Sequence, residues 1–375
     1  MELLDLGRIA VGLVLLVAGA EALVRGASSL ARRIGMSSLV VGLTVVAVAT
    51  STPELAVTMD AVLSGAPDLA VGNVVGSNIA NILLILGVSA LVLPLTVRLR
   101  LVRLDVPIMV FLSVLLLVLA LDGTVGQVDG LLLLLGFVAY TAVSVVLGRR
   151  PDAGEAGPAD AAPAAEAVSA TAADDKPPAS VLVSLVLVAV GIALLVGGAR
   201  LLVAGASNIA EALGVSGLVI GLTVVAVGTS LPELAASVVA ARRGERDMAV
   251  GNIVGSNIAN IGLILGLPAV LAGGGVPVPG AAIALDMPLM IATAVALLPI
   301  AFTGFVIRRW EGAFFIALYA AYTAYLVLAA TEHDALRGFT SVMLGFVLPL
   351  VAVTLVAVTA YEVGVRRGRR AAVPG

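Results

Sequence analysis

Long apolar stretches alternate with short polar connections along the whole chain. Each stretch is long enough to cross a hydrocarbon core about 30 Å thick as a helix. A membrane β-barrel would show short segments of alternating polarity instead. The pattern therefore predicts an all-α polytopic membrane protein with eleven spans, near residues 6–24, 38–63, 69–93, 104–121, 128–147, 181–212, 215–241, 248–272, 281–306, 311–330 and 339–363.

Composition supports the same class of protein. The chain is 61% apolar and 12% charged, and its mean hydropathy of +1.16 is far above the range of soluble domains. Glu2 and Asp5 stand where a cleaved signal peptide has basic residues, so we expect the first span to be retained.

Two segments of the chain repeat two others almost letter for letter. Residues 42–54 read GLTVVAVATSTPE, and residues 221–233 read GLTVVAVGTSLPE. Residues 71–87 read VGNVVGSNIANILLILG, and residues 250–266 read VGNIVGSNIANIGLILG. At a constant offset of 179, 26 of the 30 aligned positions are identical. Self-similarity of this kind indicates an internal duplication.

The basic residues gather in alternate connections. Eighteen of the 21 Lys and Arg residues lie between spans 1 and 2, 3 and 4, 5 and 6, 7 and 8, 9 and 10, or after span 11. The positive-inside rule places these connections in the cytoplasm and the N-terminus outside. Because spans 2 and 7 are five steps apart, the two copies of the duplicated sequence cross the membrane in opposite directions.

This topology predicts two inverted five-helix repeats, an arrangement that places substrate sites on broken helices near the midplane. The acidic, Ala- and Pro-rich segment between the repeats is expected to be a disordered cytoplasmic linker, with calcium sensing by its acids as the alternative. The predicted parts are a first repeat (1–148), the linker (149–180), a second repeat (181–330), and an extra helix with a basic cytoplasmic tail (331–375).

Each copy of the repeat contains a T-S-x-P-E element in apolar sequence. Pro53 and Pro232 lack a backbone donor, and each ring clashes with the carbonyl four residues earlier, so the helices are expected to break there. Polar and ionisable groups at such a place in the membrane indicate a functional site. The residues expected at the two breaks are Thr50, Ser51, Glu54, Thr229, Ser230 and Glu233.

Each copy also contains a G-N-x-x-G-S-N-x-x-N element. Its first Asn, its Ser and its last Asn are spaced i, i+4 and i+8, so they line one face of a helix. The glycines have the small-x-x-x-small spacing that permits close helix packing. The residues of the two polar stripes are Asn73, Ser77, Asn81, Asn252, Ser256 and Asn260. The alternative is that the amides only hold helices together, which is the expected role of Asn78 and Asn257.

All of these groups offer oxygen ligands, which suit a hard cation. Ca²⁺ takes about 6–8 oxygens in flexible geometry, whereas Mg²⁺ gives up its waters reluctantly. Two buried carboxylates repel each other unless a cation or a proton lies between them, so Glu54 and Glu233 are expected to share an ion. With no Cys and only His333, the chain is not expected to hold a transition metal through thiolate or imidazole ligands.

The same residues resemble those of a known family. The paired T-S-x-P-E and G-N-x-x-G-S-N-x-x-N elements are similar to the α-repeats of the calcium/cation antiporter superfamily, and most similar to its prokaryotic sodium/calcium exchanger branch. The resemblance implies a bundle of ten helices in a prokaryotic cell (inner) membrane, with ion sites on spans 2, 3, 7 and 8. It also implies that spans 1 and 6 slide past this core.

The resemblance further assigns roles to individual residues. It implies that Glu54 and Glu233 bind Ca²⁺ with help from Thr50 and Thr229. The sodium sites that it implies use Ser51, Ser77, Ser230 and Ser256 with backbone carbonyls that include those of Ala47 and Ala226. Asn81 and Asn260 stand where potassium-dependent relatives have Asp, which argues against potassium cotransport.

We therefore predict a secondary antiporter that exchanges Ca²⁺ for Na⁺ and is not an enzyme. Ca²⁺/H⁺ exchange on the same scaffold is the alternative, since protons can also discharge the two glutamates. A passive channel fits the inverted repeats and broken helices less well, and an intramembrane enzyme would need a nucleophile and base that the motifs do not supply. We expect no cofactor besides the transported ions, no nucleic acid and no obligatory protein partner.

Overall fold

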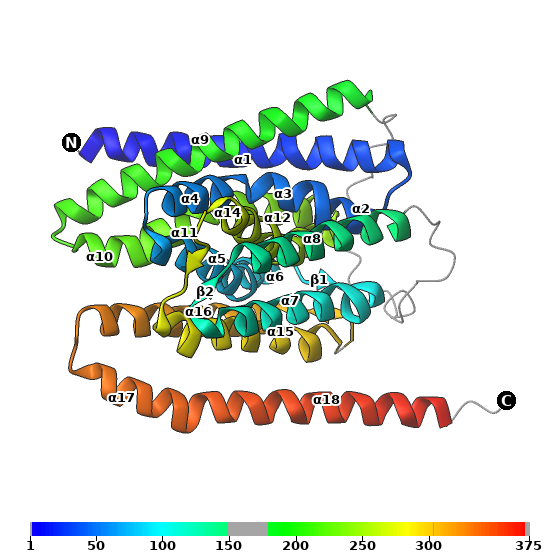
Figure 1. Ribbon diagram of the computed structural model, residues 1–375. Coiled ribbons are helices and arrows are strands. Elements are labelled where there is room, and N and C mark those ends of the chain that lie inside the picture. Colours follow the sequence, from blue (N-terminus) through cyan, green and yellow to red (C-terminus); the bar gives the residue numbers. More distant parts are fainter. Residues whose placement is uncertain (1, 149–178, 303, 372–375) are drawn as a thin grey trace.

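The computed structural model describes residues 2–148, 179–302 and 304–371. The chain in these ranges is almost entirely helical, with two short two-stranded ladders (Figure 1). The predicted linker lies outside the described residues except for its last two positions, 179 and 180.

The helices of the described residues occupy the same eleven regions that hydropathy predicts. Nine are long and apolar enough to cross a membrane, and the number rises to eleven if each of two bent pairs forms one span. The bent pairs are Ser38–Thr50 with Thr52–Leu63, at 45°, and Thr223–Thr229 with Leu231–Arg242, at 52°. The first helix is longer than predicted and runs over Glu2–Ile34.

The elements of the first half follow one another in the order of the expected spans. They are α1 (Glu2–Ile34), α2 (Ser38–Val41), the π-helical η1 (Gly42–Val46), α3 (Ala47–Thr50), α4 (Thr52–Leu63), α5 (Pro67–Ala80), the π-helical η2 (Asn81–Leu86), α6 (Gly87–Val92), β1 (Leu95–Thr96), the π-helical η3 (Leu101–Asp105), α7 (Val106–Leu119), the 3₁₀ turn η4 (Ala120–Asp122), β2 (Thr124–Val125) and α8 (Gln127–Gly148).

The second half repeats this order and then adds a C-terminal helical segment. Its elements are α9 (Val181–Ala212), α10 (Gly217–Ile220), the π-helical η6 (Gly221–Val225), α11 (Ala226–Thr229), α12 (Leu231–Arg242), α13 (Arg246–Ala259), the π-helical η7 (Asn260–Leu265), α14 (Gly266–Leu271), β3 (Val276–Pro277), the π-helical η8 (Ala282–Asp286), α15 (Met287–Phe302), β4 (Val306–Ile307), α16 (Arg309–Ala330), α17 (Ala335–Val342), the π-helical η9 (Met343–Val347) and α18 (Leu348–Ala371).

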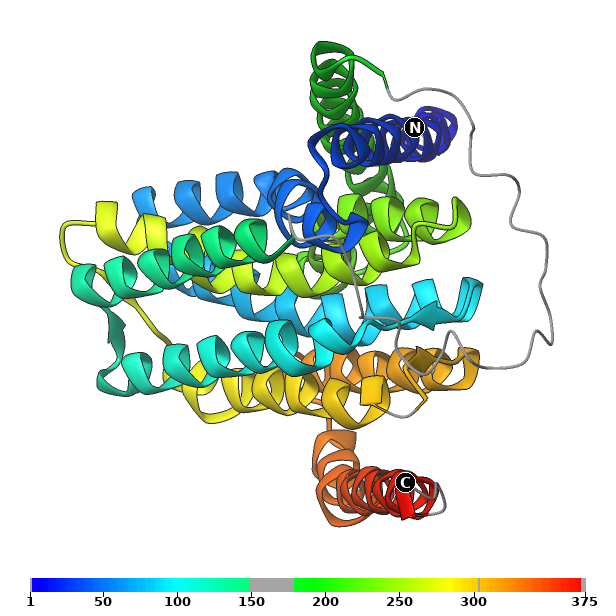
Figure 2. The same ribbon diagram turned by 90° about the vertical axis from the view of Figure 1, so that its right-hand side faces the viewer.

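The molecule has three parts (Figures 1 and 2). A central bundle contains the duplicated segments, the paired helices α1 and α9 cover one face of it, and α17 to α18 lie beyond α15 and α16 on the opposite face. The most deeply buried helices are α5–α6 and α13–α14, which carry the polar stripes: 78% and 83% of their apolar windows are buried.

Glycines at seven-residue intervals bring α1 and α9 together. An added Cβ at Gly12 would lie 2.7 Å from the backbone oxygen of Gly198, and one at Gly19 would lie 2.9 Å from that of Gly191. As residue numbers increase along α1, the numbers of the residues that they contact in α9 decrease, so the two helices are antiparallel. Because larger side chains would separate the backbones, the glycines account for this close packing.

The two ladders join the two halves of the chain. β1 pairs with β4, with Leu95 opposite Ile307, and β2 pairs with β3, with Thr124 opposite Pro277. Each ladder therefore contains one strand from each half. They lie toward opposite ends of the bundle in Figure 1.

Candidate ion-binding site

Both T-S-x-P-E elements break their helices at the serine. Ser51, between α3 and α4, has φ −84° and ψ 8°, and Ser230, between α11 and α12, has φ −90° and ψ 5°. A proline follows in the first turn of each new helix, where its missing N–H costs no helical hydrogen bond. The predicted breaks are confirmed, but Glu54 and Glu233 lie in the first turn after the break and not in unwound chain.

The two glutamates lie together in the interior. Glu54 is 2% exposed and Glu233 is 1% exposed, and they are close enough to interact electrostatically. Ser51 Oγ donates a 2.8 Å hydrogen bond to Glu233 Oε1, which connects the break in the first half to the carboxylate of the second. The Oε2 atoms of both glutamates have no hydrogen-bond partner among the described residues. The helix N-termini of α4 and α12 offset only part of this negative charge.

The first asparagine of each stripe is held by the helix that follows the break. Asn73 Nδ2 donates to Thr58 Oγ1 at 2.9 Å and to the backbone carbonyl of the glutamate of its own copy at 3.2 Å. Asn252 makes the same two contacts, with Ser237 Oγ at 2.9 Å and with the backbone carbonyl of its own glutamate at 3.4 Å. The amide nitrogens are thereby occupied, so the side-chain oxygens remain as acceptors.

Thr58 and Ser237 are residues that the motif analysis missed. They are related by the same offset of 179, and each lies four residues after its glutamate, on the same helix face. These two signals were present in the sequence and would have identified both hydroxyls.

The last asparagine of each stripe joins the two halves. Asn81 Nδ2 donates to Asn257 Oδ1 at 3.0 Å, and Asn260 Nδ2 donates to Asn78 Oδ1 at 3.1 Å. Asn78 and Asn257 therefore hold helices together, as predicted. The Oδ1 atoms of Asn81 and Asn260 are buried without a hydrogen-bond partner among the described residues.

The stripe serines complete a set of buried oxygens. Ser77 is 4% exposed and Ser256 is fully buried. Within the described chain, the predicted ligand atoms that are buried without a hydrogen-bond partner are Glu54 Oε2, Glu233 Oε2, Ser230 Oγ, Ser256 Oγ, Asn81 Oδ1 and Asn260 Oδ1. Unpartnered buried oxygens are costly and call for an explanation. A hard cation that takes several oxygen ligands provides one.

The two halves of the site differ in exposure. In the first half Thr50 is 2% exposed and Ala47 is fully buried, whereas Thr229 is half-buried and Ala226 is exposed. Thr50 Oγ1 donates to Asn252 Oδ1 at 3.2 Å. In the part of the chain that the structure describes, Thr229 makes no such bond with an asparagine; its hydroxyl donates to the carbonyl of Ala226 at 3.1 Å.

The carbonyls of the two alanines differ in the same sense. The carbonyl of Ala47 accepts from Ser51 N at 3.0 Å and from Thr50 Oγ1 at 3.3 Å. In the second half the Ser230 N–H bonds to Val227 O at 3.1 Å instead. The Ala226 carbonyl is therefore the less occupied of the two predicted carbonyl ligands.

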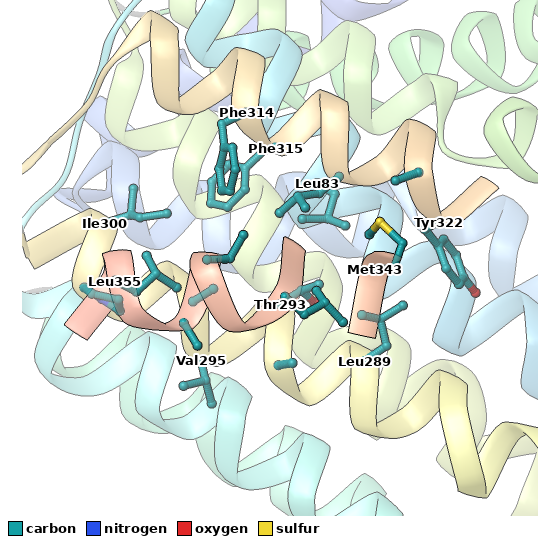
Figure 3. Close-up of a pocket in the computed structure, with 18 of the residues that line it drawn as sticks. Leu83, Leu289, Thr293, Val295, Ile300, Phe314, Phe315, Tyr322, Met343 and Leu355 are labelled. Carbon is teal, nitrogen blue, oxygen red and sulfur yellow. The ribbon is translucent and has the colours of Figure 1, made fainter. Parts of the chain in front are cut away.

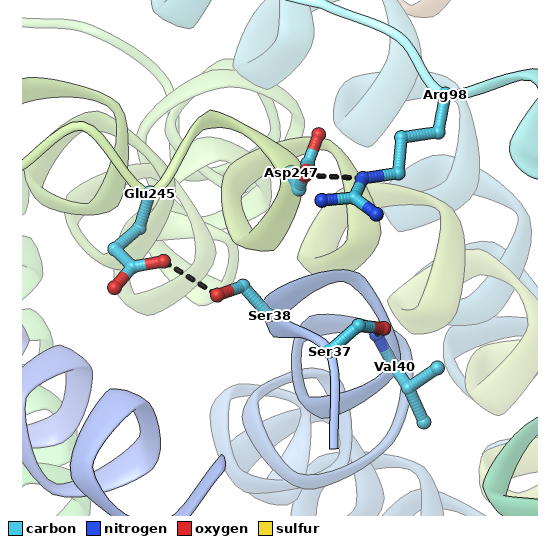
Figure 4. A network of polar contacts seen from close by, with 6 residues as sticks. All are labelled: Ser37, Ser38, Val40, Arg98, Glu245 and Asp247. Carbon is cyan, nitrogen blue, oxygen red and sulfur yellow. Dashed lines mark hydrogen bonds and ion pairs between the residues drawn. The ribbon is translucent and has the colours of Figure 1, made fainter. Parts of the chain in front are cut away.

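Polar contacts connect the turn between α12 and α13 with α1, α2 and the chain after β1. Glu245 accepts hydrogen bonds from Ser28 of α1 at 2.5 Å and from Ser38 of α2 at 2.6 Å. Asp247 forms a 2.5 Å ion pair with Arg98, which follows β1 (Figure 4). Arg243 pairs with Glu21 of α1 in the same region.

The sequence also predicts helix capping by Asp105 and Asp286, each of which stands two residues before a proline near the start of spans 4 and 9. Asp105 makes no side-chain capping bond and accepts from Tyr140 OH at 3.0 Å instead. Asp286 accepts from Tyr322 OH at 3.2 Å. A capping role for these two aspartates is therefore wrong, because both side chains turn toward the next helix.

Comparison with known proteins agrees with this geometry. The model of the family described as "Sodium/calcium exchanger protein" matches residues 5–146 and 183–328. The chain is 38% identical to the "Putative antiporter CaxA" of Alkalimonas amylolytica over 77% of its own length and 87% of that protein. It is 36% identical to the "Sodium/calcium exchanger MaX1" of Methanosarcina acetivorans, over 85% and 96% of the two chains.

A solved structure has the same fold. The sodium-calcium exchanger NCX_Mj superposes with a TM-score of 0.71 at 34% identity, covering 86% of this chain and 99% of that one. These relatives are transporters and not enzymes. The chain therefore belongs to the sodium/calcium exchanger protein family, and within it to the prokaryotic exchanger-like branch.

Proposed function

We propose that this protein is a secondary antiporter that moves Ca²⁺ across the membrane in exchange for Na⁺. The observation that carries the proposal is the pair of buried glutamates, one from each half, with Ser51 bonded to Glu233 and one oxygen of each carboxylate unpartnered among the described residues. A divalent cation between them neutralises both charges. The named activities of the relatives MaX1 and NCX_Mj agree with this choice of ions.

The ligands divide between the two ions. Glu54 and Glu233, with Thr50 and Thr229, bind Ca²⁺. The sodium sites use four hydroxyls and the carbonyls of the two alanines: Ser51, Ser77, Ser230, Ser256, Ala47 and Ala226. The asparagines at the two ends of each stripe complete and orient the site: Asn73, Asn81, Asn252 and Asn260.

The exchange follows from the pair of buried charges that either kind of ion can neutralise. Ca²⁺ between the two glutamates and sodium ions in the neighbouring sites neutralise the same pair of buried charges, so either kind of ion excludes the other. An empty site leaves two buried charges that repel each other, so movement with an empty site is unfavourable. Coupling therefore requires no contact between the two kinds of ion.

The two halves form inverted repeats, with the N-terminus outside and the C-terminus in the cytoplasm. Three features support this topology: the basic connections alternate along the sequence, the ladders pair strands across the halves, and the asparagine bonds are reciprocal. In this orientation the end fastened by Glu245 and Asp247 is cytoplasmic, and the exposed half-site at Ala226 faces the outside. The α1–α9 pair, packed through glycines, moves as one body against the core.

Ca²⁺/H⁺ exchange is the second candidate, because protons can discharge Glu54 and Glu233 without any other ligand. The buried hydroxyl and amide oxygens favour Na⁺, since a proton needs none of them.

Uptake of radioactive Ca²⁺ into sealed liposomes tests the proposal. The purified protein is reconstituted with an outward Na⁺ gradient, an outward H⁺ gradient or no gradient. We expect uptake with Na⁺ alone. Uptake with H⁺ alone would reassign the coupling ion. If neither gradient drives uptake, calcium antiport is refuted.

A further inference from the structure

A large apolar groove separates the C-terminal helical segment from the bundle. It has a volume of about 1170 Å³ and lies between α15 and α16 on one side and α17, η9 and α18 on the other. Figure 3 shows Phe314, Phe315 and Tyr322 on the bundle side, with Met343 and Leu355 from the C-terminal segment. The wall formed by the C-terminal segment, from Phe339 to Ala360, lies beyond residue 328, where the family match ends.

The groove is not closed by close packing of the C-terminal segment. No residue in the most apolar window of Ala335–Ala357 is buried, although its mean hydropathy is 2.3. Helices in a membrane associate through close packing of small residues or through polar contacts. Here the segment touches α15 and α16 without burying any residue of its apolar window, so the space left between them needs an occupant.

The lining determines what that occupant is. None of the described residues that line the groove is charged, and four have hydroxyls: Thr293 and Tyr322, which already donate to Met290 O and Asp286 Oδ1, and Tyr325 and Thr340. Ordered water needs two to four polar partners, so water does not fill such a space. An empty space would forfeit dispersion contacts over its whole lining. A hydrocarbon chain satisfies both conditions, and the volume is that of a site for a large ligand.

One mouth of the groove carries the groups that recognise a lipid head group. Trp310, 60% exposed, lies four residues before Phe314 and therefore extends the groove face of α16 by one turn. Arg308 and Arg309 are exposed beside it. Tryptophan is typical of membrane–water interfaces, and arginines next to spanning helices attract anionic head groups.

The C-terminal segment returns to the same end of the bundle. Because α16 leads into α17, α18 runs back toward the end where α16 begins (Figure 1).

We infer that this groove binds one anionic phospholipid. An acyl chain lies between α15–α16 and the C-terminal segment, and the phosphate group lies at the mouth formed by Arg308, Arg309 and Trp310. The lipid then fills the gap and attaches the C-terminal segment to the bundle.

The only tryptophan of the chain gives a direct test, because its fluorescence reports on this mouth alone. The full-length protein is reconstituted in phosphatidylcholine liposomes that contain an increasing mole fraction of brominated lipid, either anionic phosphatidylglycerol or zwitterionic phosphatidylcholine. We expect the anionic lipid to quench Trp310 at the lower mole fraction, by about fivefold for each arginine that contacts the head group. Arg308→Gln with Arg309→Gln should remove this preference.

Filling the groove separates a bound lipid from lipid that merely surrounds the protein. Ala321→Phe with Ala352→Phe places two rings among the lining residues, and Ala320→Phe, at an exposed position of α16 outside the lining, is the matched control. We expect reduced quenching in the filled variant and normal quenching in the control, with the thermal unfolding temperature of each variant as the check on folding.

Three results would overturn the inference. They are equal quenching by both head groups, unchanged quenching in the filled variant, and quenching that falls as protein density rises, which would mean that a second copy of the chain covers the groove. Because fluorescence is measured without transport, none of these results depends on the ion that the protein exchanges.

Discussion

The two copies of the repeat have nearly the same sequence but are packed differently. On one side η1 lies directly against α13: an added Cβ at Gly42 would lie 2.5 Å from a backbone oxygen of α13, and one at Gly251 would lie 2.7 Å from a backbone oxygen of α2. On the other side the equivalent glycines, Gly221, Gly72 and Gly76, have no atom within 4 Å of the same added carbon. The side where η1 meets α13 is shut by backbone contact, and the side where η6 faces α5 is open; below, these two sides are called the shut half and the open half of the site.

The difference teaches that the packing is a property of the conformation and not of the local sequence. The open half has the same glycines as the shut half, so it has what it needs for the same close contact. In the proposed cycle the open half closes with the packing that the shut half has now, which is the kind of change between two packed states that alternating access requires.

The connections at the two ends are not equivalent, however. The shut half is also fastened through Glu245 and Asp247, whereas the corresponding positions of the open half are Ala66 and Asp68. We expect the charged connection to bias the molecule toward the conformation described here.

The largest effect is expected from the residues that do not share in this asymmetry. Glu54 and Glu233 are both buried although one half of the site is open, so Glu54→Gln and Glu233→Gln should each stop Ca²⁺ uptake. We expect a loss of at least about 100-fold, because the loss of groups that only support a metal ligand already costs about 10–100-fold in affinity. Uptake into liposomes under a Na⁺ gradient measures this.

Asp60→Asn is the control for the glutamate variants. Asp60 lies on α4 like Glu54 but is exposed, so its loss should leave uptake unchanged. Retained uptake in only one glutamate variant would mean that the two halves contribute unequally to the ion site.

A smaller effect is expected in the rates at which thiols introduced at positions 47 and 226 react. The chain has no cysteine, so Ala47→Cys and Ala226→Cys each introduce a single thiol. Ala47 is fully buried and Ala226 is exposed, so a small water-soluble thiol reagent should label position 226 at least about tenfold faster, the ratio given by an opening cost of only about 1.4 kcal/mol.

Ser64→Cys, in the exposed connection after α4, provides the upper limit of the labelling rate. Slowing of the reaction at position 226 by saturating Ca²⁺ or Na⁺, with no change at position 64, would show that the open half closes over the ions. Equal rates at positions 47 and 226 would contradict the asymmetry.

The sequence was sufficient to predict the parts of the site that depend on local chemistry. The helix breaks follow from proline at positions 53 and 232, which removes a backbone donor in any context. The oxygen-rich stripes follow from spacing on a helix, and the duplication indicated which residues to pair. The prediction that Asn78 and Asn257 hold helices together also follows from the face on which they lie.

The rest depends on contacts between distant segments. The Ser51–Glu233 bond and the reciprocal asparagine bonds exist only because two halves of the chain meet. The aspartates at positions 105 and 286 were expected to cap their helices, but a tyrosine of the following helix competes successfully for each carboxylate. Because the two segments are nearly identical in sequence, their sequences do not determine which side of the site is closed in this conformation. The asymmetry therefore could not be predicted from the repeat.

The smallest expected effect comes from adding one methyl group to each stripe. In Gly255→Ala the new carbon would lie 2.7 Å from Leu43 Cα, so the backbones must separate, whereas Gly76→Ala meets nothing within 4 Å. Overpacking costs about 1–3 kcal/mol, and alanine returns about 0.5–1 kcal/mol of helix stability. Thermal unfolding in detergent should therefore show Gly255→Ala less stable by about 1–2 kcal/mol and Gly76→Ala unchanged or slightly more stable.

If the open half closes during exchange as the shut half is closed now, Gly76→Ala should nevertheless slow Ca²⁺ uptake while leaving Ca²⁺ affinity intact. Equal destabilisation by the two variants would mean that the two stripes are packed alike in solution, and unchanged uptake in Gly76→Ala would mean that closure does not bring α5 against η6.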